Sequence, residues 1–103
     1  MGHWVRVAAD GDVAGGQIKG VAAAGKRLAL CRVGDDFYAV DDRCTHDDGP
    51  LADGAVEDHQ IECPRHGARF DLRTGEVKCL PAIIPIKSYP VKVEGHDVLV
   101  HVD

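Results

Sequence analysis

Two short segments of the sequence each place a cysteine close to a histidine. The first is Cys44-Thr45-His46, the second is Cys63-Pro64-Arg65-His66, and residues 47–62 separate them. Thiolate and imidazole are the side chains that best hold iron, zinc and copper in proteins. One such pair is weak evidence, because short motifs often arise by accident. Two pairs, both in segments rich in Gly and Pro, predict a metal site made of Cys44, His46, Cys63 and His66.

The order of the four candidate ligands bears on the kind of metal site. A Cys2His2 set is a common structural zinc site, but zinc fingers usually place two cysteines together and then two histidines. Here each segment supplies one of each. That order suits a binuclear centre in which both cysteines reach one metal and both histidines reach the other, as in a Rieske [2Fe–2S] centre. Zinc stays open as the alternative.

Length and charge limit the functions open to this chain. Its 103 residues make a single domain, 1–103, with little room for a deep catalytic cavity. The formal net charge is −5, whereas a nucleic-acid-binding protein would show a basic excess. No apolar run approaches the roughly 20 residues that span a bilayer, and no signal peptide is visible. We therefore expect a cytoplasmic protein with no nucleic-acid partner and no membrane partner.

The other two cysteines are expected to have structural roles. In a reducing compartment, four cysteines are ligands or free thiols rather than two disulfides. Cys31 lies in a strand-like run and is expected in the core, and Cys79, just past the second pair, is also expected to be structural.

The elements that must position the ligands are short strands. No helical apolar stripe of ten residues or more is present, whereas β-branched and aromatic runs recur at 4–7, 17–22, 27–33, 37–40, 60–62, 88–93 and 97–102. Two hairpins are predicted, with turns at 34–36 and 94–96. The sequence therefore predicts an all-β fold, a small antiparallel β-sandwich or barrel. A loop-rich, cluster-binding subdomain, approximately residues 43–80, is inserted between the hairpins.

Both ligand segments resemble the cluster-binding loops of soluble Rieske-type ferredoxins. The stretches CTHDDGPLADG and CPRHGARFDLRTGEV look like those loops, and the closing PVKVEGHDVLVHV is similar to their last hairpin. The likeness covers the chain from about Val33 to its end. It implies the Rieske fold and one Rieske-type [2Fe–2S] cluster. Cys44 and Cys63 would bind the buried iron, and His46 and His66 the outer iron. It also implies a proline-bearing loop, with Pro81 and Pro85, that covers the cluster.

The sequence departs from the high-potential branch of this family. Those proteins carry an extra cysteine in each loop, joined as a disulfide, and the matching positions here are Gly49 and Arg65. They also place a serine and a tyrosine, both hydrogen-bonded to cluster atoms, where this chain has Ala68 and Phe70. Hydrogen bonds to the sulfurs favour the reduced state, so their loss predicts a potential at the low end of the Rieske range, roughly −150 to +300 mV.

The resemblance implies a one-electron carrier and not an enzyme in itself. It would act as a monomer that passes electrons from an NAD(P)H-dependent flavin reductase to a terminal oxygenase. The alternatives are a Rieske protein of iron–sulfur cluster assembly or nitrite reduction, a structural zinc-binding interaction module, and a redox or iron sensor. The stretch from Asp41 to Asp58 holds seven acidic residues and one basic residue, Arg43, which predicts steering toward basic partners.

Overall fold

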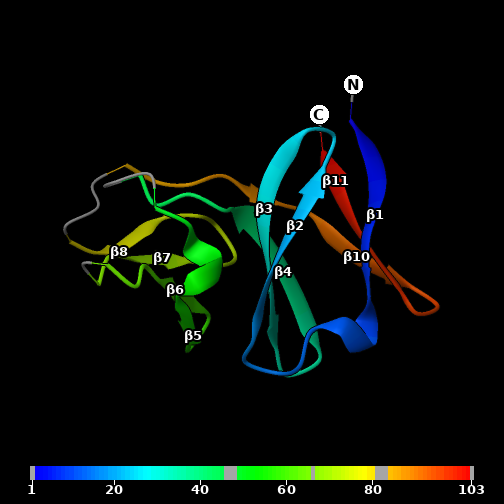
Figure 1. Cartoon of the computed structure of the whole chain (residues 1–103), viewed down its shortest axis with the longest axis horizontal. Coiled ribbons are helices and arrows are strands. Elements are labelled where there is room, and N and C mark those ends of the chain that lie inside the picture. Colours follow the sequence, from blue (N-terminus) through cyan, green and yellow to red (C-terminus); the bar gives the residue numbers. More distant parts are fainter. Residues whose placement is uncertain (1, 46–48, 66, 81–83, 103) are drawn as a thin grey trace.

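The protein is built from three antiparallel sheets, and the predicted all-β fold is confirmed. The computed structural model describes residues 2–45, 49–65, 67–80 and 84–102. The first sheet has the order β1-β11-β10, the second β2-β3-β4-β9 and the third β5-β6-β7-β8. Figure 1 shows the third sheet at one end of the long axis, beside the other two. No helix in the described ranges is long and apolar enough to cross a membrane.

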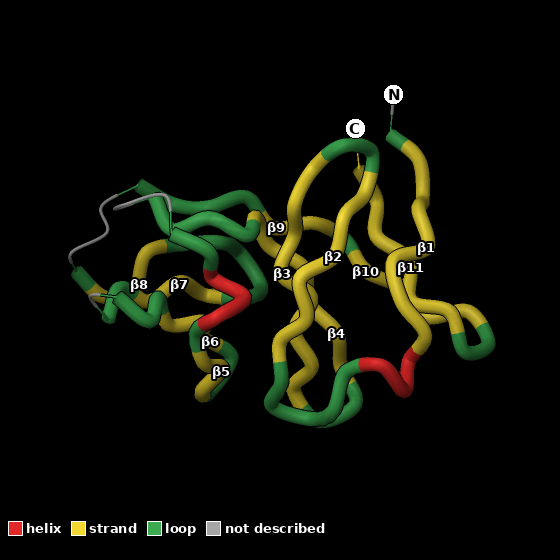
Figure 2. Tube along the Cα trace, in the orientation of Figure 1, coloured by secondary structure: helices red, strands yellow, loops and turns green. Residues whose placement is uncertain are grey.

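Most of the strands are short. Their bounds are β1 (His3–Ala9), β2 (Ile18–Ala23), β3 (Lys26–Val33), β4 (Asp36–Asp41), β5 (Ala55–Glu57), β6 (Gln60–Glu62), β7 (Arg69–Asp71), β8 (Val77–Cys79), β9 (Ser88–Tyr89), β10 (Val91–Glu94) and β11 (Asp97–Val102). Two 3₁₀ turns complete the fold, η1 (Asp10–Asp12) and η2 (Leu51–Asp53). Figure 2 shows how loops occupy much of the region around the third sheet.

The first two sheets form the frame of the molecule. Alternate residues of β11 (Val98, Val100 and Val102) are buried, as expected for a strand with one face on a core. They share one apolar cluster with Leu28 and Leu30 of β3. The two sheets therefore pack face to face as a small sandwich.

The central strand β3 is buried on both faces. Leu28 and Leu30 point into the sandwich, whereas Ala29 and Cys31 belong to a second apolar cluster. Residues of the inserted segment, such as Ile61 and Phe70, complete that second cluster. The two sides of one strand thus support both halves of the molecule, because successive side chains of a strand alternate between its faces.

The predicted hairpins are present, but both turns are shorter by one residue than predicted. Val33 stands opposite Asp36, and Glu94 stands opposite Asp97. The predicted strand 88–93 is wrong as a single element, because it divides at Pro90. β9 pairs with β4 of the second sheet, and β10 pairs with β11 of the first. Proline has no N–H for a sheet ladder, so the chain changes sheets there.

The inserted segment has a sheet of its own. The strand predicted over Gln60–Glu62 is present as β6. β5 and β7 flank it and β8 pairs with β7, in an antiparallel ladder that the sequence did not predict. Each of these strands has three residues, which is too few to show an alternating pattern against a Gly- and Asp-rich background.

Gly75 fastens this sheet to the segment that returns to the frame. Its carbonyl accepts a hydrogen bond from the N–H of Ile86 at 3.0 Å, and its N–H donates to the carbonyl of Asp71 at 2.7 Å. Its φ of +82° lies in the left-handed region, and a Cβ at this position would collide with the carbonyl oxygen of Ile86. Only glycine satisfies both the backbone angle and the close approach.

This geometry predicts a large difference between two glycine variants. Gly75→Ala should lower the free energy of unfolding by about 3 kcal/mol, because it adds a clash to the cost of the left-handed angle. Gly25→Ala should cost only about 1 kcal/mol, because Gly25 has a φ of +79° but no atom within 4 Å of the place where a Cβ would stand. Denaturant unfolding measures both values. Equal losses would mean that the approach to Ile86 relaxes without cost.

Candidate metal centre

The structure brings the two predicted cysteine ligands into one apolar cluster. Cys44 follows β4 after a short link, and Cys63 follows β6 directly. Their exposed fractions are 0% and 1%, and both belong to the cluster that includes Leu51 and Phe70. The two other predicted ligands, His46 and His66, lie outside the described residues. Among the residues that are described, no group of three or more potential metal ligands gathers.

The two ligand segments are closed by matching backbone hydrogen bonds. The N–H of Cys44 donates to the carbonyl of Gly49 at 2.8 Å, and the N–H of Cys63 donates to the carbonyl of Ala68 at 2.7 Å. Each bond joins a cysteine to the residue five positions later. Each cysteine therefore stands at the start of a closed loop that also contains the predicted histidine of its pair. The two loops thus share a closing hydrogen bond of the same span, although their Cys–His spacings differ.

A third segment contacts the first loop. The hydroxyl of Thr45 donates to the carbonyl of Ile84 at 2.5 Å, across 39 positions of sequence. Leu80 and Ile84 lie on either side of residues 81–83 and are exposed by 71% and 58%. The expected cover over the centre falls in this segment. Pro81 lies outside the described residues, and Pro85 is exposed.

Two aspartates hold the start of the first loop, and sequence reasoning missed them. The carboxylate of Asp42 is nearly buried and accepts a hydrogen bond from the N–H of Ala52 at 2.7 Å, which fixes η2 beside the link. The carboxylate of Asp41 accepts one from the hydroxyl of Tyr89 at 2.6 Å. Asp41 also donates its N–H to the carbonyl of Lys87 at 3.0 Å. The only available signal was a pair of acidic residues just before a candidate ligand.

The remaining cysteines differ from each other. Cys31 is fully buried in β3, which confirms it as a core residue. Burial raises the pKa of its thiol to about 12, so it stays protonated at neutral pH. Cys79 ends β8 and is exposed, and its expected structural role stays a prediction. All four cysteines are free of disulfide bonds in this structure.

The donor set fits a centre that is bound by thiolates at its buried side. Two thiols, each from a loop closed by a backbone hydrogen bond, lie in the same buried apolar cluster. Soft thiolate donors select iron–sulfur clusters, zinc or copper. The loops also carry one histidine each, which is the composition required by a two-cysteine, two-histidine centre.

Comparison with known proteins decides between these centres. Residues 3–90 match the family model described as the Rieske [2Fe-2S] domain. The chain belongs to this family. The predicted cofactor is therefore confirmed as a Rieske-type [2Fe–2S] cluster, and a structural zinc module is no longer required to explain the ligand pattern.

The relatives also define the type of Rieske protein. The chain is 42% identical to the ferredoxin component of the naphthalene 1,2-dioxygenase system of Pseudomonas putida, over 94% of this chain and 93% of that protein. It superposes on the ferredoxin of carbazole 1,9a-dioxygenase from Nocardioides aromaticivorans IC177 with a TM-score of 0.91 at 35% identity, covering 94% of this chain and 95% of that one. A chain in a complex of reduced oxygenase and oxidised ferredoxin in carbazole 1,9a-dioxygenase gives a TM-score of 0.88 at 39% identity, covering 94% and 91%. The Rieske protein is an electron carrier, as the sequence predicted, and not itself a catalytic enzyme.

The hydrogen bond from Thr45 predicts a change in cluster retention. Thr45→Val keeps the shape of the side chain but removes the donor to Ile84. We expect the visible absorbance of the cluster to decay about fivefold faster with a chelator, which corresponds to about 1 kcal/mol for one lost hydrogen bond.

Thr74→Val is the matched control for this prediction. Thr74 accepts only a local hydrogen bond from the N–H of Glu76 at 3.2 Å, so its loss should leave cluster decay unchanged. Decay that is equally fast in the wild type and in Thr45→Val would exclude a role for the Thr45 bond in holding the loop.

Proposed function

We propose that the protein shuttles single electrons from an NAD(P)H-dependent flavin reductase to a terminal oxygenase. The observation that carries this proposal is the pair of buried thiols on two loops, each closed by a backbone hydrogen bond of the same kind. The relatives of the chain are ferredoxin components of dioxygenase systems. When bound, the cluster supplies one reversible electron. Oxidation of one NAD(P)H releases two electrons, so the reductase would reduce two carrier molecules in turn.

We assign the four ligands by their place in the loops. Cys44 and Cys63 would bind the buried iron, because their side chains lie inside the apolar cluster. His46 and His66 would bind the outer iron, as the resemblance of the two segments to Rieske cluster-binding loops implies. The role of the chain is then to hold the ligands, to limit water at the buried side through Leu51 and its neighbours, and to leave the histidine side near the surface.

The partners and setting follow from this role. Similar proteins are named as components of naphthalene and biphenyl dioxygenase systems, which supports an oxygenase as the electron acceptor. We infer that the carrier acts as a monomer in the cytoplasm, where a nicotinamide-dependent reductase finds its substrate. Service in iron–sulfur cluster assembly or in nitrite reduction is the second candidate within the same chemistry, and it would use the same four ligands with other partners.

The ligand assignment is tested by substitution with matched controls. Cys63→Ser and His66→Ala should each abolish the red-brown colour, the two irons and two sulfides per chain, and the low-average-g EPR signal after dithionite. Cys79→Ser and His96→Ala should retain all of these, because Cys79 and His96 are exposed and belong to neither Cys/His pair. A full cluster signal in Cys63→Ser would overturn the assignment.

The proposed route is tested by electron delivery. The reduced protein, mixed with the terminal oxygenase of carbazole 1,9a-dioxygenase from Nocardioides aromaticivorans IC177, should be oxidised as the oxygenase becomes reduced. Failure to transfer to this oxygenase, with transfer to a nitrite reductase instead, would favour the second candidate.

We also propose a reduction potential at the low end of the Rieske range. Ala68 and Phe70 are fully buried beside the ligand loop and carry no hydroxyl group. Ala68→Ser should move the midpoint potential in the positive direction, because a hydroxyl donor near the sulfurs stabilises the reduced state. Protein-film voltammetry measures the shift, and Ala52→Ser, on η2, serves as the control. An unchanged or more negative midpoint in Ala68→Ser would contradict the hydrogen-bond explanation.

A further inference from the structure

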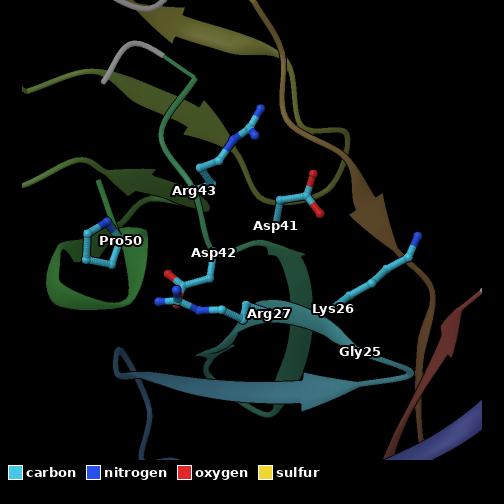
Figure 3. A pocket seen from close by; sticks show the side chains of 7 residues that line it. All are labelled: Gly25, Lys26, Arg27, Asp41, Asp42, Arg43 and Pro50. Atoms are coloured by element: carbon cyan, nitrogen blue, oxygen red, sulfur yellow. The ribbon is translucent and has the colours of Figure 1, made fainter. Parts of the chain in front are cut away.

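A charged cleft lies between the frame and the inserted sheet. It has a volume of about 470 Å³, and its walls are the β2–β3 turn, the link after β4 and the residue before η2. The lining residues are Gly25, Lys26, Arg27, Asp41, Asp42, Arg43 and Pro50. We call this the neck cleft. Figure 3 shows its three basic side chains around the opening, with Arg27 reaching across to Asp42.

The acidic groups of the neck cleft are bound to the protein itself. One oxygen of Asp42 accepts from the N–H of Ala52 at 2.7 Å, and the other lies 3.9 Å from the guanidinium of Arg27. The side chain of Asp42 is only 6% exposed, whereas that of Arg27 is 77% exposed. Asp41 accepts from the hydroxyl of Tyr89 at 2.6 Å. Both carboxylates are therefore engaged by groups of the protein itself, and the guanidinium of Arg27 is left largely exposed.

Two more contacts enlarge the basic surface. The ammonium of Lys26 lies 5.8 Å from the centroid of the Tyr89 ring, and that of Lys87 lies 5.0 Å from the same centroid. One ring thus gathers two positive charges beside the carboxylate of Asp41. This basic surface belongs to a chain with a formal net charge of −5, so it stands out against its surroundings.

We propose that the neck cleft binds a carboxylate-bearing surface segment of the protein that accepts the electron. Arginine guanidinium groups match carboxylates through paired hydrogen bonds. Arg43 directly precedes the predicted ligand Cys44, so a segment seated here is held beside the ligand loop. The overall negative charge disfavours the approach of small free anions. A partner already in contact with the cluster loops presents its carboxylates at high effective concentration.

This inference rests on the proposed function and refines the predicted docking. The acidic run 41–58 is expected to attract basic partners, yet the carboxylates of Asp41 and Asp42, in its first part, already accept hydrogen bonds from Tyr89 and Ala52. The partner surface should accordingly present acidic groups at the neck cleft, whatever it presents to the rest of that run.

The test measures electron transfer by stopped flow at low ionic strength. The reduced protein is mixed with the oxidised terminal oxygenase of carbazole 1,9a-dioxygenase from Nocardioides aromaticivorans IC177. Removing both charges with Lys26→Gln and Arg27→Gln should lower the second-order rate constant about fivefold, and the difference should shrink at high salt. The control, Arg6→Gln with Lys92→Gln, removes the same charge from β1 and β10 and should leave the rate near that of the wild type.

Further outcomes separate the explanations. Lys26→Gln alone, which leaves the contact between Arg27 and Asp42 in place, should still slow transfer with an unchanged cluster spectrum. Carbodiimide should join Lys26 to an Asp or Glu of the oxygenase, and cross-links confined to Lys92 would overturn the proposal. Equal transfer rates in the neck and control variants would also overturn the proposal. The same holds if calorimetry shows that the wild type binds inorganic phosphate and the double variant does not, while the transfer rate of the double variant stays unchanged. A wild-type protein that keeps its cluster but never reduces the oxygenase would instead contradict the proposed function.

Discussion

The two-sided burial of β3 is the constraint on which the rest of the molecule depends. Leu28 and Leu30 belong to the sandwich core, and Ala29 and Cys31 belong to the core of the inserted segment. A strand with one solvated face could stabilise only one of these cores. Because both are built on the same strand, the short sheet β5–β8, which has little apolar surface of its own, is held against a rigid support. The frame therefore determines where the cluster-binding loops lie.

Rigid support also explains how two loops of different sequence are closed by the same kind of backbone hydrogen bond. Cys44 and Cys63 each begin a loop closed by a hydrogen bond to the residue five positions later. The bond from Thr45 to Ile84 and the close approach of Gly75 to Ile86 tie the return segment to the same region. The described parts of the ligand region are therefore fixed largely by backbone contacts, which suits a carrier whose cluster should change little in geometry between its two redox states.

The neck between the two halves combines structural and recognition roles. Asp41 and Asp42 place the first ligand loop by accepting hydrogen bonds from Tyr89 and Ala52. These bonds engage both carboxylates, while Arg27 and Arg43 are exposed at the neck cleft. Formal charge along the sequence is thus a poor guide to the charge that a partner meets, because a carboxylate bound inside the protein no longer acts as a free surface group.

The sequence by itself determined the all-β class, both hairpins, the strand Gln60–Glu62 and a metal site of two Cys/His pairs, because alternating apolar residues and paired Cys and His residues are local patterns. It did not reveal β5, β7 and β8, whose three residues each become strands only through pairing within the β6 ladder. Nor did it show that Pro90 moves the chain from one sheet to another, since that depends on which edges are free. Tertiary structure likewise decided the hydrogen bonds of Asp41 and Asp42 and the matching bonds that close the two ligand loops. Their partners lie elsewhere in the chain or across a closed turn.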